Sequence, residues 1–278
     1  MKIGISADST CDLPKELIEK YDINIVPLYV NLGDDQYTEA DITYKEIYDF
    51  VDKTGVLPKT SARTPEDYKE VFSKLREKYD AVIHFSLSFE ISSTGTNAVQ
   101  AAKELENVYV IDTKQLSSGS GILILSAIDK INANKPLSDI LAECESEANR
   151  VQSSFIINKL NYLYKGGRCS AVAVFGANLL KLKIRIQLIN GKMEATKKYM
   201  GPLKSVLPKY VDDIIKENPP VKTRCFVTSS SPMEGLKEEI VEKVKALGFK
   251  EVYPMQAGAT ICSHCGPETI GILYLREP

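Results

Sequence analysis

Strand-like and helix-like patterns alternate along the first 150 residues, and this alternation restricts the possible folds more than any other feature of the sequence. Apolar runs at 2–7, 81–86 and 108–112 are predicted strands, and helices are predicted at 64–79 and 94–106. The pattern also predicts a strand at 23–30 and helices at 12–20, 43–55, 121–132 and 137–151. Such an order favours an α/β fold with a parallel sheet between helices, whose ligands bind beyond the carboxyl ends of the strands.

The pattern changes after about residue 150. Asn190 and Gly191 are a strong signal for a hairpin turn between strands at 185–189 and 192–197. Helices are predicted at 172–180, 202–217 and 231–247, and strands at 154–157, 225–228, 251–255 and 270–275. Hairpins beside helices indicate an α/β sandwich. We therefore predict two domains, an N-terminal parallel-sheet α/β domain at 1–150 and a C-terminal α/β domain at 151–278.

The charges of the chain nearly cancel, since 35 Lys and Arg against 37 Asp and Glu leave a net charge of -2. No basic excess points to nucleic acid or to an anionic lipid surface. No segment approaches the roughly 20 apolar residues that a membrane helix needs, and the strand pattern at 2–7 does not resemble a signal peptide. We expect a cytoplasmic protein without a nucleic-acid partner and without stable membrane insertion.

The sequence lacks the short motifs of several enzyme classes, among them the phosphate-binding GxxxxGK[ST], the GxSxG turn and the zinc-binding HExxH. The six cysteines lie mostly in apolar runs and are expected in the core. Cys262 and Cys265 form one CxxC, which leaves zinc or redox chemistry as an alternative, although one pair supplies too few ligands for a structural zinc site. We expect no enzymatic activity, no metal and no cofactor.

Three loops at predicted strand ends are rich in hydroxyl groups. Capping of the helix that follows is the simplest explanation of the loop at 8–12, which otherwise belongs to a binding site, and capping also explains Thr64. Thr60 and Ser61 precede that cap and are not explained by it. The loop at 86–96, which includes Ser92 and Ser93, holds more hydroxyls than one helix start can use. Hydroxyls beside a helix start, without a dedicated cation, suit a carboxylate better than a triphosphate.

The chain has only two histidines. His84 lies in an apolar strand and is expected to be a buried core residue. His264 lies in a Ser-His-Cys-Gly-Pro segment, predicted to be a loop, where it has either a polar role or a turn role. Two catalytic alternatives stay open: an acyl hydrolase that uses Ser92 with His264, and a small-molecule kinase.

A series of short landmarks, spread over almost the whole chain, resembles the DegV family in content and order. The landmarks are Asp8-Ser9-Thr10-Cys11-Asp12-Leu13-Pro14, Asp41-Ile42-Thr43, Lys59-Thr60-Ser61, Leu87-Ser88 with Ile91-Ser92, Val110-Ile111-Asp112-Thr113 with Gly119-Ser120-Gly121, Leu160-Asn161-Tyr162-Leu163 with Gly166-Gly167-Arg168, and Ser263-His264-Cys265-Gly266 with Ile270-Gly271. Each landmark is weak alone, but the series is specific.

The resemblance implies two α/β domains with a long-chain fatty acid buried between them. It implies that hydroxyls of Thr60 and Ser92 hold the carboxylate, with Ser61 and Ser93 beside them and His264 near the head group. The tail would lie in an apolar tunnel. Candidate walls, each of which is otherwise a plain core residue, are Phe155, Ile157, Leu160, Leu179 and Leu182.

The resemblance also implies a partner. Better-studied members are the fatty-acid-binding subunits of bacterial fatty acid kinase, in which a separate kinase subunit phosphorylates the bound carboxylate. The segment Gly166-Gly167-Arg168 is the candidate docking site for such a kinase. Another reading is a regulatory module whose lipid is structural.

Overall fold

The computed structural model describes residues 1–169 and 182–278. In the N-terminal half, four parallel strands form a sheet with the order β2-β1-β6-β7. The strands are β1 (Ile3–Asp8), β2 (Asn24–Val26), β6 (Ala81–Ser86) and β7 (Val108–Asp112). Every residue of β6 is buried, as expected for a strand covered on both faces. The predicted parallel sheet is therefore confirmed.

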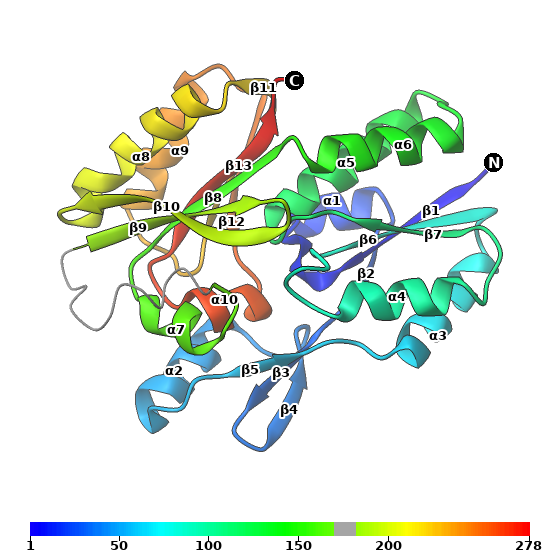
Figure 1. Cartoon of the computed structure of the whole chain (residues 1–278), viewed down its shortest axis with the longest axis horizontal. Helices are drawn as coiled ribbons and strands as arrows, with labels where there is room; N and C mark the ends of the chain where they lie inside the picture. Colours follow the sequence, from blue (N-terminus) through cyan, green and yellow to red (C-terminus); the bar gives the residue numbers. More distant parts are fainter. Residues whose placement is uncertain (170–181) are drawn as a thin grey trace.

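Helices cover both faces of this sheet (Figure 1). On one face, Tyr68 and Phe72 of α3 (Pro65–Arg76) pack with Ala98 of α4 (Thr94–Ala102). On the other face lies α5 (Ser118–Asn132), with α6 (Leu137–Ala148) beside it. The short helix α1 (Lys15–Lys20) follows a 3-10 turn at Ser9–Cys11.

A second, six-stranded sheet has the order β10-β9-β8-β13-β11-β12. Its strands are β8 (Val151–Ile157), β9 (Leu182–Ile189), β10 (Lys192–Met200), β11 (Pro220–Ser229), β12 (Glu251–Gln256) and β13 (Ile270–Arg276). β11 and β12 are parallel and the other neighbours antiparallel, with β9 and β10 forming the predicted hairpin. On one face pack α8 (Leu203–Glu217) and α9 (Leu236–Ala246).

Helix α5 connects the two sheets, because residues of both pack in the same core. Its residues from Ser118 to Leu125 are all buried, as in a helix covered on every side. Ile5 and Ile83 of the parallel sheet share this core with Phe226 and Leu273 of the second sheet. The predicted boundary near residue 150 falls between α6 and β8, and the division into two domains stays a prediction.

A third sheet of three short antiparallel strands was not predicted. It has the order β4-β3-β5 and consists of β3 (Tyr29–Leu32), β4 (Asp35–Thr38) and β5 (Lys59–Ser61). Near it lie α2 (Tyr44–Thr54), α7 (Leu160–Lys165) and α10 (Ala259–Cys265), which come from distant parts of the chain (Figure 1). This assembly contributes Thr60 and His264 to the site described below.

Several predicted elements are wrong in detail. The strand expected at 23–30 is split at Pro27 into β2 and β3, which belong to different sheets. α9 begins at Leu236 rather than near Ser231, because Met233 and Gly235 have positive φ angles that a helix does not allow. The segment around His264 is the helix α10 rather than a loop. The helix predicted at 172–180, with Leu179, lies outside the described residues.

Asp12 does not cap the helix that follows it. α1 begins at Lys15 after Pro14, without a side-chain cap. Asp12 instead has a φ angle of 42°, and its carboxylate accepts hydrogen bonds from Ser117 Oγ and from the Gly258 amide. The acidic end of the first hydroxyl-rich loop therefore connects it to α5 and to the segment before α10.

Candidate ligand-binding cavity

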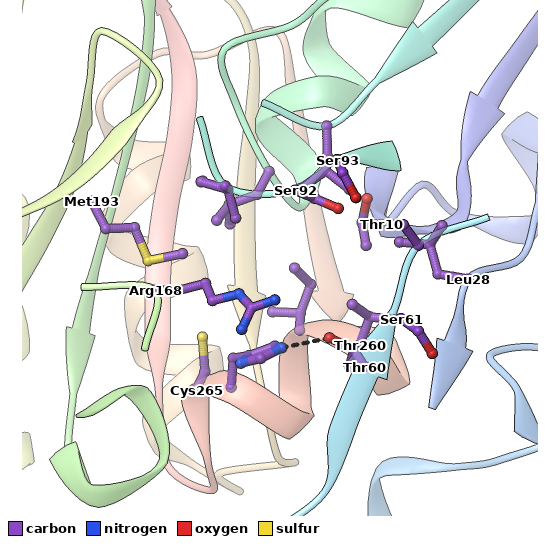
Figure 2. Close-up of a pocket in the computed structure, with 16 residues that line it drawn as sticks. Thr10, Leu28, Thr60, Ser61, Ser92, Ser93, Arg168, Met193, Thr260 and Cys265 are labelled. Carbon is purple, nitrogen blue, oxygen red and sulfur yellow. Dashed lines mark hydrogen bonds between the residues drawn. The ribbon is translucent and has the colours of Figure 1, made fainter. Parts of the chain in front are cut away.

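A cavity of about 270 Å³ lies where the loops after β1 and β6 meet β5 and α10 (Figure 2). Its polar lining includes the four predicted head-group residues Thr60, Ser61, Ser92 and Ser93, and also His264. These residues come from three separate parts of the chain. The structure therefore brings together every residue that was predicted to surround a carboxylate.

Two further hydroxyls line the cavity and were not singled out by the sequence. Thr10 comes from the 3-10 turn after β1, is almost fully buried, and its Oγ1 has no hydrogen-bond partner among the described residues. Thr260 lies in α10, four residues before His264 and therefore on the same face of the helix. That spacing was the signal available in the sequence, but it required α10 to be recognised as a helix.

Thr60 and His264 form a polar pair across the cavity wall, drawn as a dashed line in Figure 2. The distance from Thr60 Oγ1 to His264 Nε2 is 2.8 Å. Burial, with a smaller contribution from the charge of Arg168, lowers the pKa of His264 to about 4, so the imidazole is neutral at pH 7. The backbone of Gly166 packs closely against the His264 ring, and only glycine leaves room for the ring there, because a Cβ atom would lie 2.7 Å from His264 Nδ1.

Arg168 points its guanidinium group into the cavity between Met193 and the Thr60–His264 pair (Figure 2). Its Nη1 donates to the Gly166 carbonyl at 2.8 Å, and the residue is exposed, so it lies at the mouth. From the sequence, Arg168 was predicted only to take part in partner docking, and the head-group site was predicted to hold hydroxyls without a cation. The structure adds a cation to the candidate head-group site.

Asp12 and Glu39 hold the start of α10 in place through hydrogen bonds. Glu39 accepts hydrogen bonds from the amide and hydroxyl of Thr260, both at 2.9 Å, while Asp12 accepts from the Gly258 amide at 2.9 Å. Burial, followed by the charge of Glu39, raises the pKa of Asp12 to about 7. Burial also raises the pKa of Glu39. The two acids thereby position Thr260 and the helix that carries His264.

Asp8 holds the loop after β6, which carries Ser92. Its Oδ2 accepts hydrogen bonds from Ser86 Oγ at 2.7 Å and from the Leu87 amide at 2.9 Å, and its Oδ1 accepts from Tyr68. Burial alone would raise the pKa of Asp8, but the neighbouring His84 and the hydrogen bonds from Tyr68 and Ser86 hold it below its usual value. The carboxylate therefore stays ionised at neutral pH.

The cavity is apolar on the side away from these hydroxyls. Leu116, Ile261 and Cys265 line it and also line a smaller compartment of about 30 Å³ behind it. Phe155, one of the predicted tail walls, lines that compartment. The other described wall candidates, Ile157, Leu160 and Leu182, line neither space and instead pack in the same apolar cluster as Phe155.

Two alternatives from the sequence, a serine hydrolase and zinc or redox chemistry at the CxxC, find no support in the part of the chain that the structure describes. A serine hydrolase would require a hydrogen bond between Ser92 and His264. Ser92 Oγ instead accepts a hydrogen bond from the Thr94 amide, and His264 Nε2 pairs with Thr60. No group of three or more His, Cys, Asp or Glu residues there could hold a metal ion. Burial raises the pKa of the Cys265 thiol to about 12, so it is not a reactive thiolate.

A comparison with family models decides the family. The model of the DegV family, whose description calls it uncharacterised, matches residues 2–277. The chain belongs to the DegV family. The resemblance seen in the short landmarks is therefore confirmed over nearly the whole length.

Similar proteins carry names that describe fatty-acid binding. The chain is 30% identical to the fatty acid-binding protein of Thermotoga maritima, over 98% of this chain and 96% of that protein. A fatty-acid-binding DegV family protein of Thermus thermophilus has a similar structure, with a TM-score of 0.90 and 31% identity over 100% of both chains. The DegV structure of Bacillus subtilis, described as a fatty acid binding protein, gives 0.85 and 29%, also over 100% of both chains.

These matches confirm the predicted DegV-like α/β fold. The relatives are named for binding and not for a reaction, which agrees with the expectation that this DegV protein is not itself an enzyme. None of the helices that the structure describes is both long enough and apolar enough to cross a bilayer. The cytoplasmic location stays a prediction.

Proposed function

We propose that the chain binds a long-chain fatty acid with its carboxylate in the hydroxyl-lined cavity, and that it presents this carboxylate to a separate kinase. The observation that carries the proposal is the pairing of a polar cavity, lined by Thr60, Ser92 and His264, with an apolar compartment behind it. A molecule with one acidic end and one long apolar end matches that pairing. The names of the relatives support the same ligand class.

The head group is held by neutral donors and one exposed cation. When His264 Nε2 donates to Thr60 Oγ1, the Thr60 hydroxyl proton is free to donate to a carboxylate oxygen. Ser92 donates to the other oxygen, and Thr10 Oγ1, which is buried without a partner, supplies a third donor. These bonds offset the cost of removing a carboxylate from water. Arg168 adds charge at the mouth without enclosing the acid.

The tail extends past Leu116, Ile261 and Cys265 toward Phe155. These three side chains line both spaces, so the tail reaches Phe155 by displacing them. Each buried methylene contributes about 0.8 kcal/mol, so a sixteen-carbon chain gains on the order of 10 kcal/mol before losses. The affinity therefore depends mainly on the tail, and the hydroxyls fix which end is presented.

The kinase step uses the exposed mouth. A carboxylate oxygen attacks the γ-phosphorus of ATP held by the kinase, ADP leaves, and an acyl phosphate forms. The kinase supplies ATP and Mg²⁺, since the sequence has no phosphate-binding GxxxxGK[ST] loop. Gly166, Gly167 and Arg168 follow α7, whose Tyr164 is 55% exposed, and form the proposed docking surface beside the mouth.

The proposal is tested by identifying what the purified protein carries. Protein from a bacterial host is denatured, extracted and analysed by mass spectrometry, with a C14–C18 fatty acid expected at about one per chain. Delipidated protein should then take up added palmitate. The fatty-acid proposal is wrong if no acyl ligand is found and added palmitate is not bound. The kinase step is tested separately, by acyl-phosphate formation from the loaded protein, ATP and a fatty acid kinase.

A further inference from the structure

A second cavity, of about 240 Å³, shares no lining residue with the first. It lies at the junction of the two halves of the chain. Lys114 and Asn149 border it from the N-terminal half, and Asn190, Asn218 and Arg276 border it from the C-terminal half. A single water needs only about 10–15 Å³ of such space, so this cavity has room for a small organic molecule.

The lining is polar in an unusual way. It combines six carboxamide side chains with two cations, and no carboxylate lines it. The cations are Lys114 and Arg276. The carboxamides are those of Gln115, Asn149, Gln152, Gln187, Asn190 and Asn218. Carboxamides both donate and accept hydrogen bonds, so the lining suits a ligand with several polar groups.

The two cations are held in place without a counter-charge. Lys114 Nζ donates to Asn149 Oδ1 at 2.8 Å, and Arg276 Nη2 donates to the Asn149 carbonyl at 2.9 Å. Neither cation lies within 4.0 Å of a carboxylate anywhere in the described ranges, and the segment 170–181 contains no Asp or Glu in its sequence. Arg150, which donates to the Arg276 carbonyl, has a buried Nε without a partner there. In the described ranges, the two cationic groups at the junction are therefore not in contact with a carboxylate.

Several of the carboxamides are also available. In residues 1–169 and 182–278, Gln187 and Asn190 have no side-chain hydrogen bond. The pairing of β8 with β9 ends at Ser154 and Gln187, so the two strands separate at this cavity. Gln152 Nε2 donates to Ser154 Oγ, and its amide oxygen has no partner in the described chain. Polar groups are thus left unpaired beside positive charge.

We propose that this cavity is a binding site for a small organic anion that carries hydroxyl groups. Lys114 and Arg276 pair with its acidic group, and the Gln187 and Asn190 amides hydrogen-bond its hydroxyls. Because the lining comes from both halves of the chain, a bound anion stabilises their junction. The proposal is independent of fatty-acid binding, since the two cavities have no residue in common.

Citrate is the probe, because it combines carboxylates with a hydroxyl, and glycerol is the uncharged control. In ¹H–¹⁵N spectra of the full chain, citrate should shift the side-chain amide signals of Gln187 and Asn190 in a saturable way, with submillimolar affinity. It should also raise the thermal midpoint, because a ligand that binds only the native state stabilises it. Glycerol should do neither.

A double substitution, Lys114→Gln with Arg276→Gln, should weaken citrate binding at least about tenfold, and citrate should then raise the thermal midpoint much less than in the natural protein. The matched control, Lys53→Gln with Lys250→Gln, changes two exposed cations away from the cavity and should bind citrate normally. The proposal is overturned by an absence of saturable shifts, by equal effects of glycerol, or by equal losses in the two double variants. The single substitution Arg276→Lys, with Lys114 unchanged, should retain part of the affinity for citrate, since it keeps a cation at this position.

Discussion

Asp8 and Asp12 stand four residues apart in the same loop region, both are buried, and their pKa values shift in opposite directions. Asp8 accepts hydrogen bonds from Tyr68, Ser86 and the Leu87 amide, beside His84. Asp12 has two donors and faces the second acid, Glu39. Burial disfavours the charged form of both acids and so raises the pKa of each. The number of hydrogen-bond donors and the sign of the neighbouring charge therefore decide which acid stays ionised.

The two acids also hold different halves of the candidate site. Asp8 fixes the loop that leads to Ser92, and Asp12 with Glu39 fixes the start of α10, which carries Thr260 and His264. An ionised acid makes stronger hydrogen bonds than a neutral one, so the Ser92 side should be the more rigidly fixed. The predictions below test this difference.

The largest effect is expected for Asp8→Asn. The amide removes the charge and places an NH₂ group among three donors, so each of the remaining hydrogen bonds is weakened or lost. Hydrogen bonds to a charged group contribute about 1.5–3 kcal/mol each, and we expect a loss of about 5 kcal/mol in the free energy of unfolding. Urea denaturation at pH 7 measures it. A loss below that of Asp12→Asn would show that the Asp8 carboxylate is not the stronger anchor.

The pH dependence of stability should reveal Asp12. Its pKa is about 3.8 in the unfolded chain and about 7 in the folded protein. The native state therefore binds more protons, and stability falls as the pH rises through this range. At about 1.36 kcal/mol per pH unit, the total loss reaches about 4 kcal/mol, of which about 3 kcal/mol falls between pH 5 and pH 8. Asp8 acts in the opposite sense, because its lowered pKa gives stability that is lost only on acidification below its usual range. Urea midpoints at pH 5 and pH 8 measure the first effect, and equal midpoints would contradict it.

Fatty-acid affinity tests the two sides of the site itself. Ser92→Ala and Thr60→Val each remove one donor to the carboxylate, and we expect each to cost about 2 kcal/mol, or about 30-fold in affinity for palmitate. Thr60→Ser keeps the hydroxyl and is the matched control. Unchanged affinity in both alanine and valine variants would place the carboxylate elsewhere in the protein.

Much of this fold could be predicted from the sequence where the signals are local. The buried strand β6 is a continuous apolar run, and Asn190-Gly191 fixes the turn of the β9–β10 hairpin. The strand β5 has only three residues, Lys59–Ser61, and exists because it pairs with β3. The helix α10 has seven residues, and its place depends on hydrogen bonds from Gly258 and Thr260 to acids more than 200 residues away.

The site was predicted to the same extent. Capping did not explain Thr60 or the number of hydroxyls in the loop at 86–96, and the resemblance to the DegV family then pointed to Thr60 and Ser92. Both residues line the cavity. Thr260 was missed because a seven-residue helix gives too short a pattern to be recognised. Arg168 was assigned to docking alone, because the direction of a side chain that follows a turn is set by tertiary contacts, here its bond to the Gly166 carbonyl.

The smallest effect is expected for Asp12→Asn, and its sign should change with pH. A protonated carboxyl and a carboxamide have the same shape, and Asn can accept from the Gly258 amide while it donates to Ser117 Oγ. At pH 6 the free energy of unfolding should therefore change by less than about 1 kcal/mol. Above pH 7 the variant should be more stable than the natural protein, since it carries no buried charge beside Glu39. A loss of several kcal/mol at pH 6, similar to that of Asp8→Asn, would mean that Asp12 is ionised and that the two acids do not differ.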